Sequence, residues 1–351
     1  MDLPLHKHNS IPSKCRDAKI IATGLVNPRG LQALDDGSIL VIEAGRGEMK
    51  SPDTGRLLKL SSDISSDERK TSDIILDKQH SMNMLGMMNR DEIMGMSDIA
   101  QGDGQTLVSL TNYVAGSTVM RVSPGPVSTV FNSRGNLNSI VYHPQLKAWF
   151  GIKPDANVVV EFSATGDERI VAELADLADG QDAVPVCVIY EPSTGALLVS
   201  LFSGELGQDA AKKGIDFDKT AGQVIRVDAT TGEVTPVVTG LTAPTGIELG
   251  DDGRLYVLEL CDDFLEPLVG DNATAQCLHG GFKRFSGSLL QVDLSTGEMV
   301  VVANQLDTPS NLVKHDGHLL ISEGMGMPGR PIPGLNGEVQ PLAGFIRQVS
   351  L

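Results

Sequence analysis

One pattern recurs six times along the 351 residues of this chain. Each copy contains a turn, an apolar segment, a short polar turn and a second apolar segment, and several copies carry Asp-Gly in the short turn. The copies begin at Ala22, Ser97, Asn138, Val186, Val238 and Ala303. Asp-Gly between two apolar runs is a strong signal for a β-hairpin. A hairpin that recurs along the whole chain predicts an all-β repeat protein.

Each hairpin is followed by a variable segment, a third apolar strand and, in most copies, a short turn and a fourth strand. Four strands in each of six copies are typical of a six-bladed β-propeller, and an open β-sandwich is the alternative. The last copy has only three strands, because the chain stops after residues 344–351. Residues 18–25 resemble the missing strand. We therefore expect the N-terminal strand to complete the last blade.

These patterns predict one propeller domain over residues 18–351, preceded by an N-terminal extension over residues 1–17. The first residues contain no signal-peptide apolar region, which predicts a cytoplasmic protein, or a secreted one if a leader was removed. No apolar run reaches the roughly 18 residues of a membrane span. The net charge of −17 repels phosphate backbones, so we expect no nucleic-acid partner. The oligomeric state and the identity of the substrate stay open.

The long connections all fall on one predicted face of the propeller. We name the four strands of a blade A to D in chain order. The turns between strands A and B are short, whereas long segments follow strand B at residues 203–221, 261–285 and 324–343. Residues 77–96, which cross into the second blade, are also long. Long loops in a compact domain usually carry function, so we expect the site at the mouth of this face.

Two sets of residues are expected to line that mouth. The turns before the strands A contain Arg29, Ser97, Asn138, Val186, Thr245 and Ser310. The strands B end at Glu43, Leu110, Ile152, Leu201, Glu259 and Glu323. The glutamates fall on blades 5, 6 and 1, and the apolar residues fall on blades 2, 3 and 4. The alignment therefore predicts a mouth with an acidic half and an apolar half.

We predict that Glu43, Glu259 and Glu323, together with Asp98, supply or remove a proton. Crowded carboxylates in a site of low dielectric constant raise at least one pKa, which suits general acid–base work. The alternative is structural: a carboxylate at the end of strand B can hold backbone amides of a neighbouring blade.

Polar and apolar ligand-binding residues are also predicted. Arg29, Asn112, Asn138 and Lys153 are the candidates for orienting polar substrate atoms. Met84, Met88, Met96 and Met325 are the candidates for an apolar lid, because methionine adapts to irregular hydrophobic ligands. A small core formed among the loops themselves is the alternative for the methionines.

No motif for a metal or a nucleotide cofactor is present. The chain has neither H-x-x-x-H nor C-x-x-C, no G-x-S-x-G, and no Gly-rich loop that opens a helix. We therefore predict that no cofactor and no metal take part, with calcium as the less favoured alternative. Cys261 and Cys277 flank one loop, and a disulfide between them and two free thiols are equally compatible with the sequence.

Residues 24–48, which read GLVNPRGLQALDDGSILVIEAGRGE, resemble the opening blade of ScyD/ScyE-type propellers. Those proteins belong to the wider NHL, SMP-30/gluconolactonase and strictosidine-synthase-like superfamily of six-bladed propellers. The resemblance covers nearly the whole chain as a blade pattern, and blades 1, 5 and 6 match closely. It implies the fold directly and the function only broadly, because one fold hosts many chemistries.

The resemblance implies two kinds of chemistry. SMP-30-like lactonases bind a divalent metal through Glu, Asn and Asp; Asn138 matches that set, but the expected Asp before Gly is missing and Asp98 lies one place late. Strictosidine-synthase-like members use an acidic residue in an apolar pocket, and related fungal propellers catalyse dehydration and hetero-Diels–Alder cyclisation. We therefore predict an enzyme of secondary metabolism that binds a small hydrophobic substrate. A metal-dependent lactonase or esterase and a non-enzymatic binding propeller are the alternatives.

Overall fold

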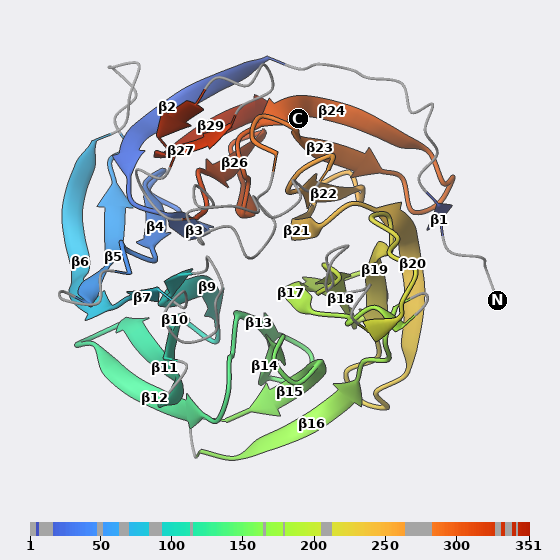
Figure 1. Cartoon of the computed structure of the whole chain (residues 1–351). Coiled ribbons are helices and arrows are strands. Elements are labelled where there is room, and N and C mark those ends of the chain that lie inside the picture. The colour runs from blue at the N-terminus through green and yellow to red at the C-terminus, as the bar shows by residue number, and fades with distance from the viewer. Residues whose placement is uncertain are drawn as a thin grey trace. The chain divides into compact units, whose positions relative to one another are not determined.

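The computed structural model describes residues 5–6, 17–47, 52–62, 70–83, 93–112, 115–163, 166–177, 180–204, 213–263, 283–326, 331–333, 339–341 and 343–351. In this part of the chain, six sheets of four or five strands form the six blades of a β-propeller (Figure 1). The predicted fold class is therefore confirmed. The outer strands carry many exposed residues, whereas the second strands of the blades are almost entirely buried.

Blades 1, 2 and 3 follow one another along the chain. Blade 1 contains β3 (Pro28–Ala33), β4 (Ile39–Glu43), β5 (Asp53–Leu60) and β6 (Thr71–His80). Blade 2 contains β9 (Met96–Gly102), β10 (Gln105–Asn112), β11 (Gly116–Ser123) and β12 (Ser128–Ser133). Blade 3 contains β13 (Ser139–His143), β14 (Ala148–Lys153), β15 (Val158–Phe162) and β16 (Glu168–Glu173). In each blade the strands lie in the sheet in chain order.

Blades 4 and 5 repeat this order, and blade 6 departs from it. Blade 4 contains β17 (Pro185–Glu191), β18 (Ala196–Leu201), β19 (Gly222–Val227) and β20 (Val234–Leu241). Blade 5 contains β21 (Pro244–Leu249), β22 (Leu255–Glu259), β23 (Gly287–Val292) and β24 (Met299–Leu306). Blade 6 contains β25 (Asn311–His315), β26 (His318–Glu323), β29 (Gly344–Ser350) and β2 (Ala18–Leu25). Two small pairs join β7 (Met82–Asn83) to β8 (Ile93–Met94), and β27 (Pro331–Pro333) to β28 (Val339–Pro341).

The N-terminal strand completes the last blade, as predicted. Strand β2 pairs antiparallel with β29, and Ala18 lies opposite Val349 (Figure 1). Ile21, Ala22 and Leu25 enter a core cluster with residues of blades 1 and 6. Exposure along this strand does not alternate regularly, because the pairing register with β29 shifts between Ile20 and Ala22 and again between Ala22 and Leu25.

Two residues of the predicted N-terminal extension join the propeller. Strand β1 (Leu5–His6) pairs in parallel with β20, and Leu5 lies opposite Val238. Blade 4 therefore has five strands. No sequence signal marks this addition, because a two-residue strand is too short to show alternation.

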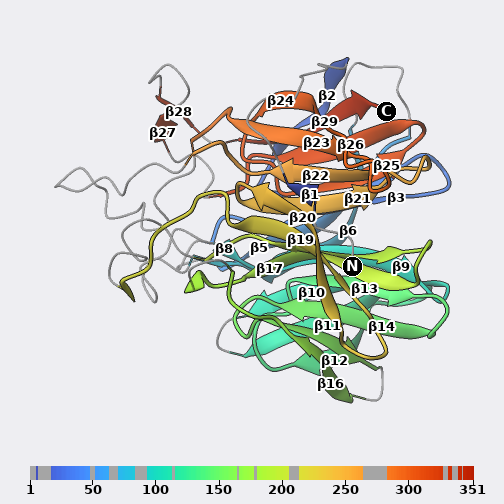
Figure 2. The ribbon, with the colours of Figure 1, turned by 90° about the vertical axis from the view of Figure 1, so that its right-hand side faces the viewer.

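Contacts between residues group the chain into two compact units. Unit 1 comprises residues 1–12, 98–259 and 290–300, and contains blades 2, 3 and 4 almost completely. Unit 2 comprises residues 13–97, 260–289 and 301–351, and contains blades 6 and 1. Blade 5 contributes residues to both units. Figure 2 shows the strands of each blade stacked edge to edge as twisted sheets.

Buried serines near the ends of strands B connect neighbouring blades. Ser200 accepts a hydrogen bond from the Cys187 amide at 3.1 Å and donates one to Thr245 O of blade 5 at 2.6 Å. Ser322 likewise accepts a hydrogen bond from the Asn311 amide and donates one to Arg29 O of blade 1. Both side chains are fully buried, so these bonds form out of contact with water. They fix the turn of the next blade against strand B of the preceding one.

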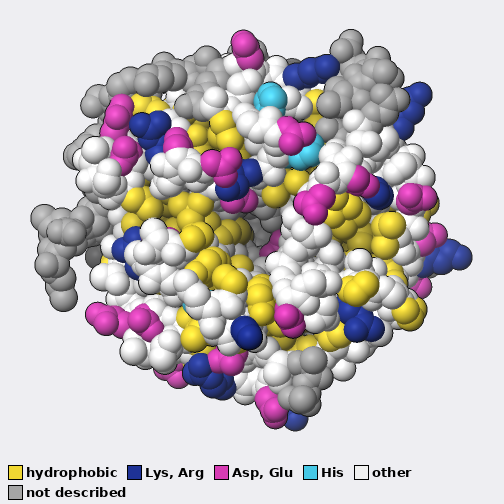
Figure 3. Space-filling view, turned by 180° about the vertical axis from the view of Figure 1, so that it is seen from behind, with side chains coloured by type: hydrophobic (Ala, Val, Ile, Leu, Met, Phe, Trp, Pro, Cys, Tyr) yellow, Lys and Arg dark blue, Asp and Glu magenta, His cyan; other side chains and the backbone are white. Residues whose placement is uncertain are grey.

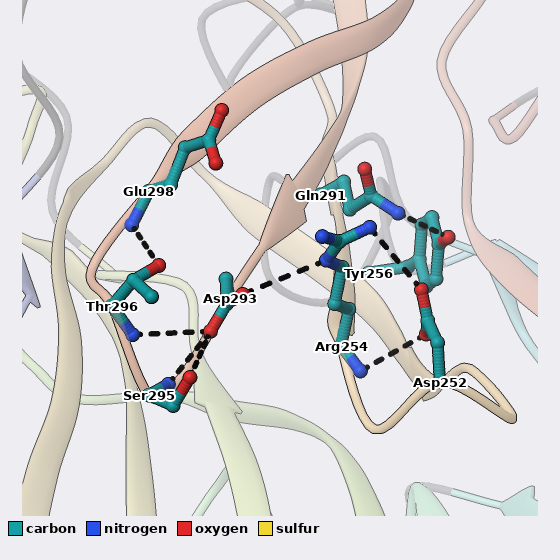
Figure 4. Close-up of polar contacts among 8 residues, drawn as sticks. All are labelled: Asp252, Arg254, Tyr256, Gln291, Asp293, Ser295, Thr296 and Glu298. Carbon is teal, nitrogen blue, oxygen red and sulfur yellow. Dashed lines mark hydrogen bonds and ion pairs between the residues drawn. The ribbon is translucent and has the colours of Figure 1, made fainter.

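The turns between strands C and D are capped by aspartates. In blade 5, Asp293 accepts hydrogen bonds from the amides of Ser295 and Thr296 and from the Ser295 hydroxyl (Figure 4). These donors lower the pKa of Asp293 to about 2. Asp228 caps the corresponding turn of blade 4 in the same way. The repeated Thr-Gly-Glu turns of the sequence are therefore Asx-type turns.

The described surface carries charges of both signs. On the face drawn in Figure 3, acidic and basic side chains are interspersed, and acidic ones occur over most of it. Among the described residues, no helix is long and apolar enough to span a membrane.

Candidate functional site

The three predicted glutamates hold the same type of turn in three different blades. Glu43 accepts a hydrogen bond from the Val26 amide at 2.8 Å. Glu259 accepts one from the Thr242 amide at 2.9 Å, and Glu323 accepts one from the Asp307 amide at 2.7 Å. Each amide lies two residues before a proline, and this proline begins strand A of the glutamate's own blade or the turn before that strand. Each glutamate therefore holds the turn that leads into its own blade, whereas the alternative considered from the sequence placed the bonded amides in a neighbouring blade.

Arginines pair with two of these glutamates. Arg56 contacts Glu43 at 2.6 Å, and Arg347 forms an ion pair with Glu323. Both carboxylates are fully buried. Burial raises the pKa of Glu43 and of Glu323, while the arginines and the backbone donors oppose that shift. A raised pKa suits proton transfer. The hydrogen bonds and ion pairs of these glutamates also suit a structural role, so their catalytic role stays a prediction.

Asp98 connects blades 2 and 3 within unit 1. Its carboxylate accepts hydrogen bonds from the Ile99 amide at 2.9 Å, the Ser139 hydroxyl at 2.6 Å and the Ile140 amide at 3.0 Å. Its side chain is 7% exposed. Both oxygens therefore already serve as acceptors, and Asp98 orders the strands A of two blades.

The predicted polar residues of unit 1 have partners within that unit, in their own blade for Asn112 and Lys153 and in blade 4 for Asn138. Asn112 accepts a hydrogen bond from the Ala115 amide at 3.1 Å, and Asn138 donates one to Val186 O at 3.0 Å. Lys153 is buried and forms an ion pair with Glu168 at 2.5 Å. The structure does not bring these residues together with Arg29 in one unit.

Four blades share an unusual turn before their strand A. Asn27, Val184, Ala243 and Thr308 all have positive φ, at 53°, 43°, 45° and 47°, and each precedes a proline. Residues other than glycine in this conformation cost about 1–3 kcal/mol and persist only where the surroundings fix them. The side chains at this position are apolar in blades 4 and 5 and polar in blades 1 and 6.

The Asn27 amide group is oriented by its surroundings. Its Oδ1 accepts hydrogen bonds from Arg29 Nε at 3.3 Å and from the Gly326 amide at 3.1 Å. A flipped amide would place its NH₂ against two donors, so Nδ2 must be the donor on the other side. The residue is 1% exposed, and among the described residues Nδ2 has no hydrogen-bond partner.

Thr308 stands at the equivalent position of blade 6. Its side chain is buried, and no described residue is a hydrogen-bond partner of its Oγ1. Its carbonyl oxygen accepts a hydrogen bond from the Met325 amide at 3.2 Å. Because Gly326 donates to Asn27, the dipeptide Met325–Gly326 connects the two polar turns.

Apolar residues of the crossing into blade 2 border these turns. Arg29 Nη2 donates to Ile93 O at 3.4 Å, and Ile93, Met94 and Met96 are buried. A Cβ atom on Gly95 would lie 2.8 Å from Ala44 O and 3.1 Å from His80 O, so glycine allows this close approach. We call this group the blade 6–1 cluster. It comprises Asn27, Arg29, His80, Ile93, Met94, Met96, Thr308 and Met325.

His80 borders the cluster through its backbone, because its carbonyl oxygen lies beside Gly95. Its Nε2 is buried and has no hydrogen-bond partner within the described part of the chain. In that part only four buried side-chain atoms lack a partner, and three of them belong to Asn27, His80 and Thr308. Buried polar groups are normally satisfied, so we take Asn27 and Thr308, whose turns are joined by Met325 and Gly326, as a candidate binding site.

The cluster contains three of the predicted binding residues, Arg29, Met96 and Met325. Met84 and Met88 lie outside the described residues, as does Cys277, so the predictions for them stay open. Sequence reasoning missed Asn27 and Thr308, and it interpreted His80, in a long loop of the predicted working face, as a surface residue. The residue before proline in each repeat was the available signal, because blades 1 and 6 carry polar side chains where blades 4 and 5 carry Val184 and Ala243.

The residues that matched a lactonase metal set do not fit a metal ion. Asp98 uses both carboxylate oxygens for hydrogen bonds, and the Asn138 amide is bonded to Val186 O. No group of three or more His, Cys, Asp or Glu side chains suited to a metal occurs among the described residues.

No family model matches this chain, and no curated protein matches it. Solved structures do match along most of its length. A luciferin-regenerating enzyme is 10% identical with a TM-score of 0.54, over 96% of this chain and 95% of that one. The chain shares the fold of these propellers. This confirms the six-bladed fold that the resemblance implied.

Two further propellers have similar scores. A putative oxidoreductase described as a glucose dehydrogenase from Thermus thermophilus is 14% identical with a TM-score of 0.54, over 95% of this chain and 99% of that one. Virginiamycin B lyase from Staphylococcus aureus is 12% identical with a TM-score of 0.50, again over 95% and 99%. At such identities the likeness shows the fold alone.

Proposed function

We propose that this propeller is an enzyme that binds a small hydrophobic molecule at the blade 6–1 cluster and promotes an elimination or cyclisation by proton transfer. The observation that supports this best is that Asn27 Nδ2 and Thr308 Oγ1 are buried without a partner among the described residues, while Arg29 bonds to the segment that holds Met94 and Met96. Each unsatisfied buried polar group costs about 1–3 kcal/mol, and a bound molecule that supplies the missing hydrogen bond recovers much of this energy. That several similar folds belong to enzymes agrees with the proposal.

The apolar part of the cluster suits a hydrophobic ligand. Ile93, Met94 and Met96 are buried beside the polar turns, and Met325 is half-buried. Methionine side chains are flexible and polarisable, so they fill the irregular space around a rigid ligand with little strain. The site would therefore select for shape and hydrophobicity.

Dehydration of a β-hydroxy ketone illustrates the chemistry. A base takes a proton from the carbon next to the carbonyl, and the C–H electron pair forms the C=C bond. The protonated base then gives this proton to the hydroxyl group, which leaves as water. We assign the proton-accepting role to His80 Nε2, because imidazole is the side chain that most often performs general base catalysis. Glu43 and Glu323 are the alternatives in this unit, and Glu259 and Asp98 are the alternatives in unit 1.

Arg29 would stabilise the charge that develops on the carbonyl oxygen. Its Nε and Nη2 are held by Asn27 Oδ1 and Ile93 O, so the guanidinium is ordered before a substrate binds. Donors that are fixed in advance stabilise an oxyanion without reorganisation, which is usually a large part of catalysis.

The test is turnover of a panel of terpenoid and polyketide β-hydroxy ketones by wild-type protein and by His80→Gln. His318→Gln is the matched control, because His318 begins β26 beside the short turn of blade 6, where its Nδ1 bonds to Asp316 O. We expect His80→Gln to lower kcat about 100-fold or more and the control to keep full activity. Equal activity of the two variants would reject His80 as the base. Activity that is lost with EDTA and restored by calcium would favour the lactonase instead.

A further inference from the structure

We propose that Asn27 and Thr308 together bind an oxygen atom of the substrate, either a ketone carbonyl or a carboxylate. This inference rests on the proposed function, because it specifies the polar group of the hydrophobic molecule bound at the blade 6–1 cluster. It comes from two equivalent turns in neighbouring blades, which Met325 and Gly326 join through hydrogen bonds to Thr308 O and Asn27 Oδ1.

The two residues form a matched pair. Both have positive φ, both precede a proline, and both are 1% exposed. The turns that hold them are fixed by Glu43 through the Val26 amide and by Glu323 through the Asp307 amide. A buried side chain at this position is therefore held rigidly, as a binding residue requires.

Hydrogen-bond chemistry decides which ligand atom fits. Asn27 Nδ2 can only donate, because Oδ1 is engaged by Arg29 and Gly326. The Thr308 hydroxyl can donate a second hydrogen bond. An oxygen with two lone pairs can accept a hydrogen bond from both donors at once. An ammonium group has only donors, so it cannot accept a hydrogen bond from Asn27 Nδ2, and its positive charge repels Arg29.

The carboxylates around the cluster are already compensated. Asp307, next to Thr308, forms a buried ion pair with Arg284. Glu43 is paired with Arg56, and Glu323 is paired with Arg347. An incoming oxygen, neutral or anionic, therefore meets donors and arginine-paired acids, even though the whole chain is strongly acidic.

The chain itself supplies substitutions that this turn accepts. Ala243 and Val184 occupy the same position with the same backbone conformation. Asn27→Ala and Thr308→Val should therefore fold, and each removes a hydrogen-bonding group with little change in the backbone. Val184→Ala in blade 4 is the matched control, because it alters the same turn in unit 1.

The experiment is a titration of methyl-labelled methionine NMR signals with 2-octanone, octanoate and octylammonium. We expect 2-octanone or octanoate to shift the signals of Met94, Met96 or Met325, and octylammonium to leave them unchanged. The two ligands distinguish a neutral carbonyl from a carboxylate. We expect Asn27→Ala and Thr308→Val each to weaken binding about fivefold to tenfold, and Val184→Ala to have no effect.

Three results would overturn the inference. If these methionines shift with wild-type affinity in both variants, the hydrophobic site stands, and the two side chains bind something other than the ligand oxygen, such as a buried water. If octylammonium binds as well as octanoate, the site does not select an oxygen. If no ligand shifts Met94, Met96 or Met325, the proposed function fails together with this inference.

Discussion

Glu323 shows how one residue combines a structural bond with an unfavourable charge. Its carboxylate accepts a hydrogen bond from the Asp307 amide and forms an ion pair with Arg347. The Arg347 guanidinium also lies 5.5 Å from the centre of the Phe345 ring. Burial still raises its pKa. A buried carboxylate of this kind depends strongly on its partner, because removal of the partner leaves a charge without compensation.

Arg347→Met tests this dependence. In the folded protein the pKa of Glu323 is raised by burial, so its contribution to stability is fully present below the unfolded pKa of about 4.3 and is lost as pH rises through the folded pKa. Without Arg347 the loss of stability at high pH becomes larger, because the buried Glu323 charge then has no arginine partner. We expect Arg347→Met to lower the free energy of unfolding by about 3 kcal/mol at pH 8 and by clearly less at pH 5, as measured by urea denaturation. The same loss at both pH values would contradict this account.

The position of the glutamates could be predicted from sequence, but their partners could not. Glu43, Glu259 and Glu323 end the strands B, which places them beside the turn of the same blade. Their arginine partners lie on strand C at different offsets: Arg56 lies directly opposite Glu43, whereas Arg347 lies opposite Ile321. Such offsets depend on side-chain length and rotamer, and no repeat pattern records them.

Strand β2 carries the closure of blade 6. Ile21 is 3% exposed and packs in the core with residues such as Leu31 and Leu320, whereas Ile20 is 43% exposed on the other face of the strand. The two neighbouring isoleucines therefore give a variant and its control within one element.

We expect Ile21→Ala to lower the free energy of unfolding by about 2–5 kcal/mol, because it removes buried methyl groups and leaves a cavity. Ile20→Ala should change it by about 0.5 kcal/mol or less. Chemical denaturation of both variants gives the comparison. Equal effects of the two substitutions would mean that β2 does not complete blade 6 in solution.

The strands could be predicted because the sequence patterns that indicate them are local. The site could not be predicted, because it depends on contacts between segments that are far apart in the sequence. Asp-Gly turns and alternating residues fix each hairpin, and the three-stranded last repeat indicates closure by residues 18–25. The cluster depends on which side chains of distant segments remain without partners. Asn27 and Thr308 are ordinary turn residues by sequence, and only their burial without partners distinguishes them.

At the scale of the molecule, the account makes unit 2 the place where the ligand binds. Blades 6 and 1 supply the polar turns, and the crossing from blade 1 supplies the methionines. The predicted acidic residues of unit 1, Glu259 and Asp98, hold backbone amides in their own unit.

Photo-crosslinking would test this most directly. An alkyl ketone that carries a diazirine group would be irradiated with the protein, and the labelled residues would be mapped by mass spectrometry. The account predicts label at Ile93–Met96 or at Met325, competed by 2-octanone. Label confined to residues 98–259, or label that 2-octanone does not displace, would contradict the assignment of the site to blades 6 and 1.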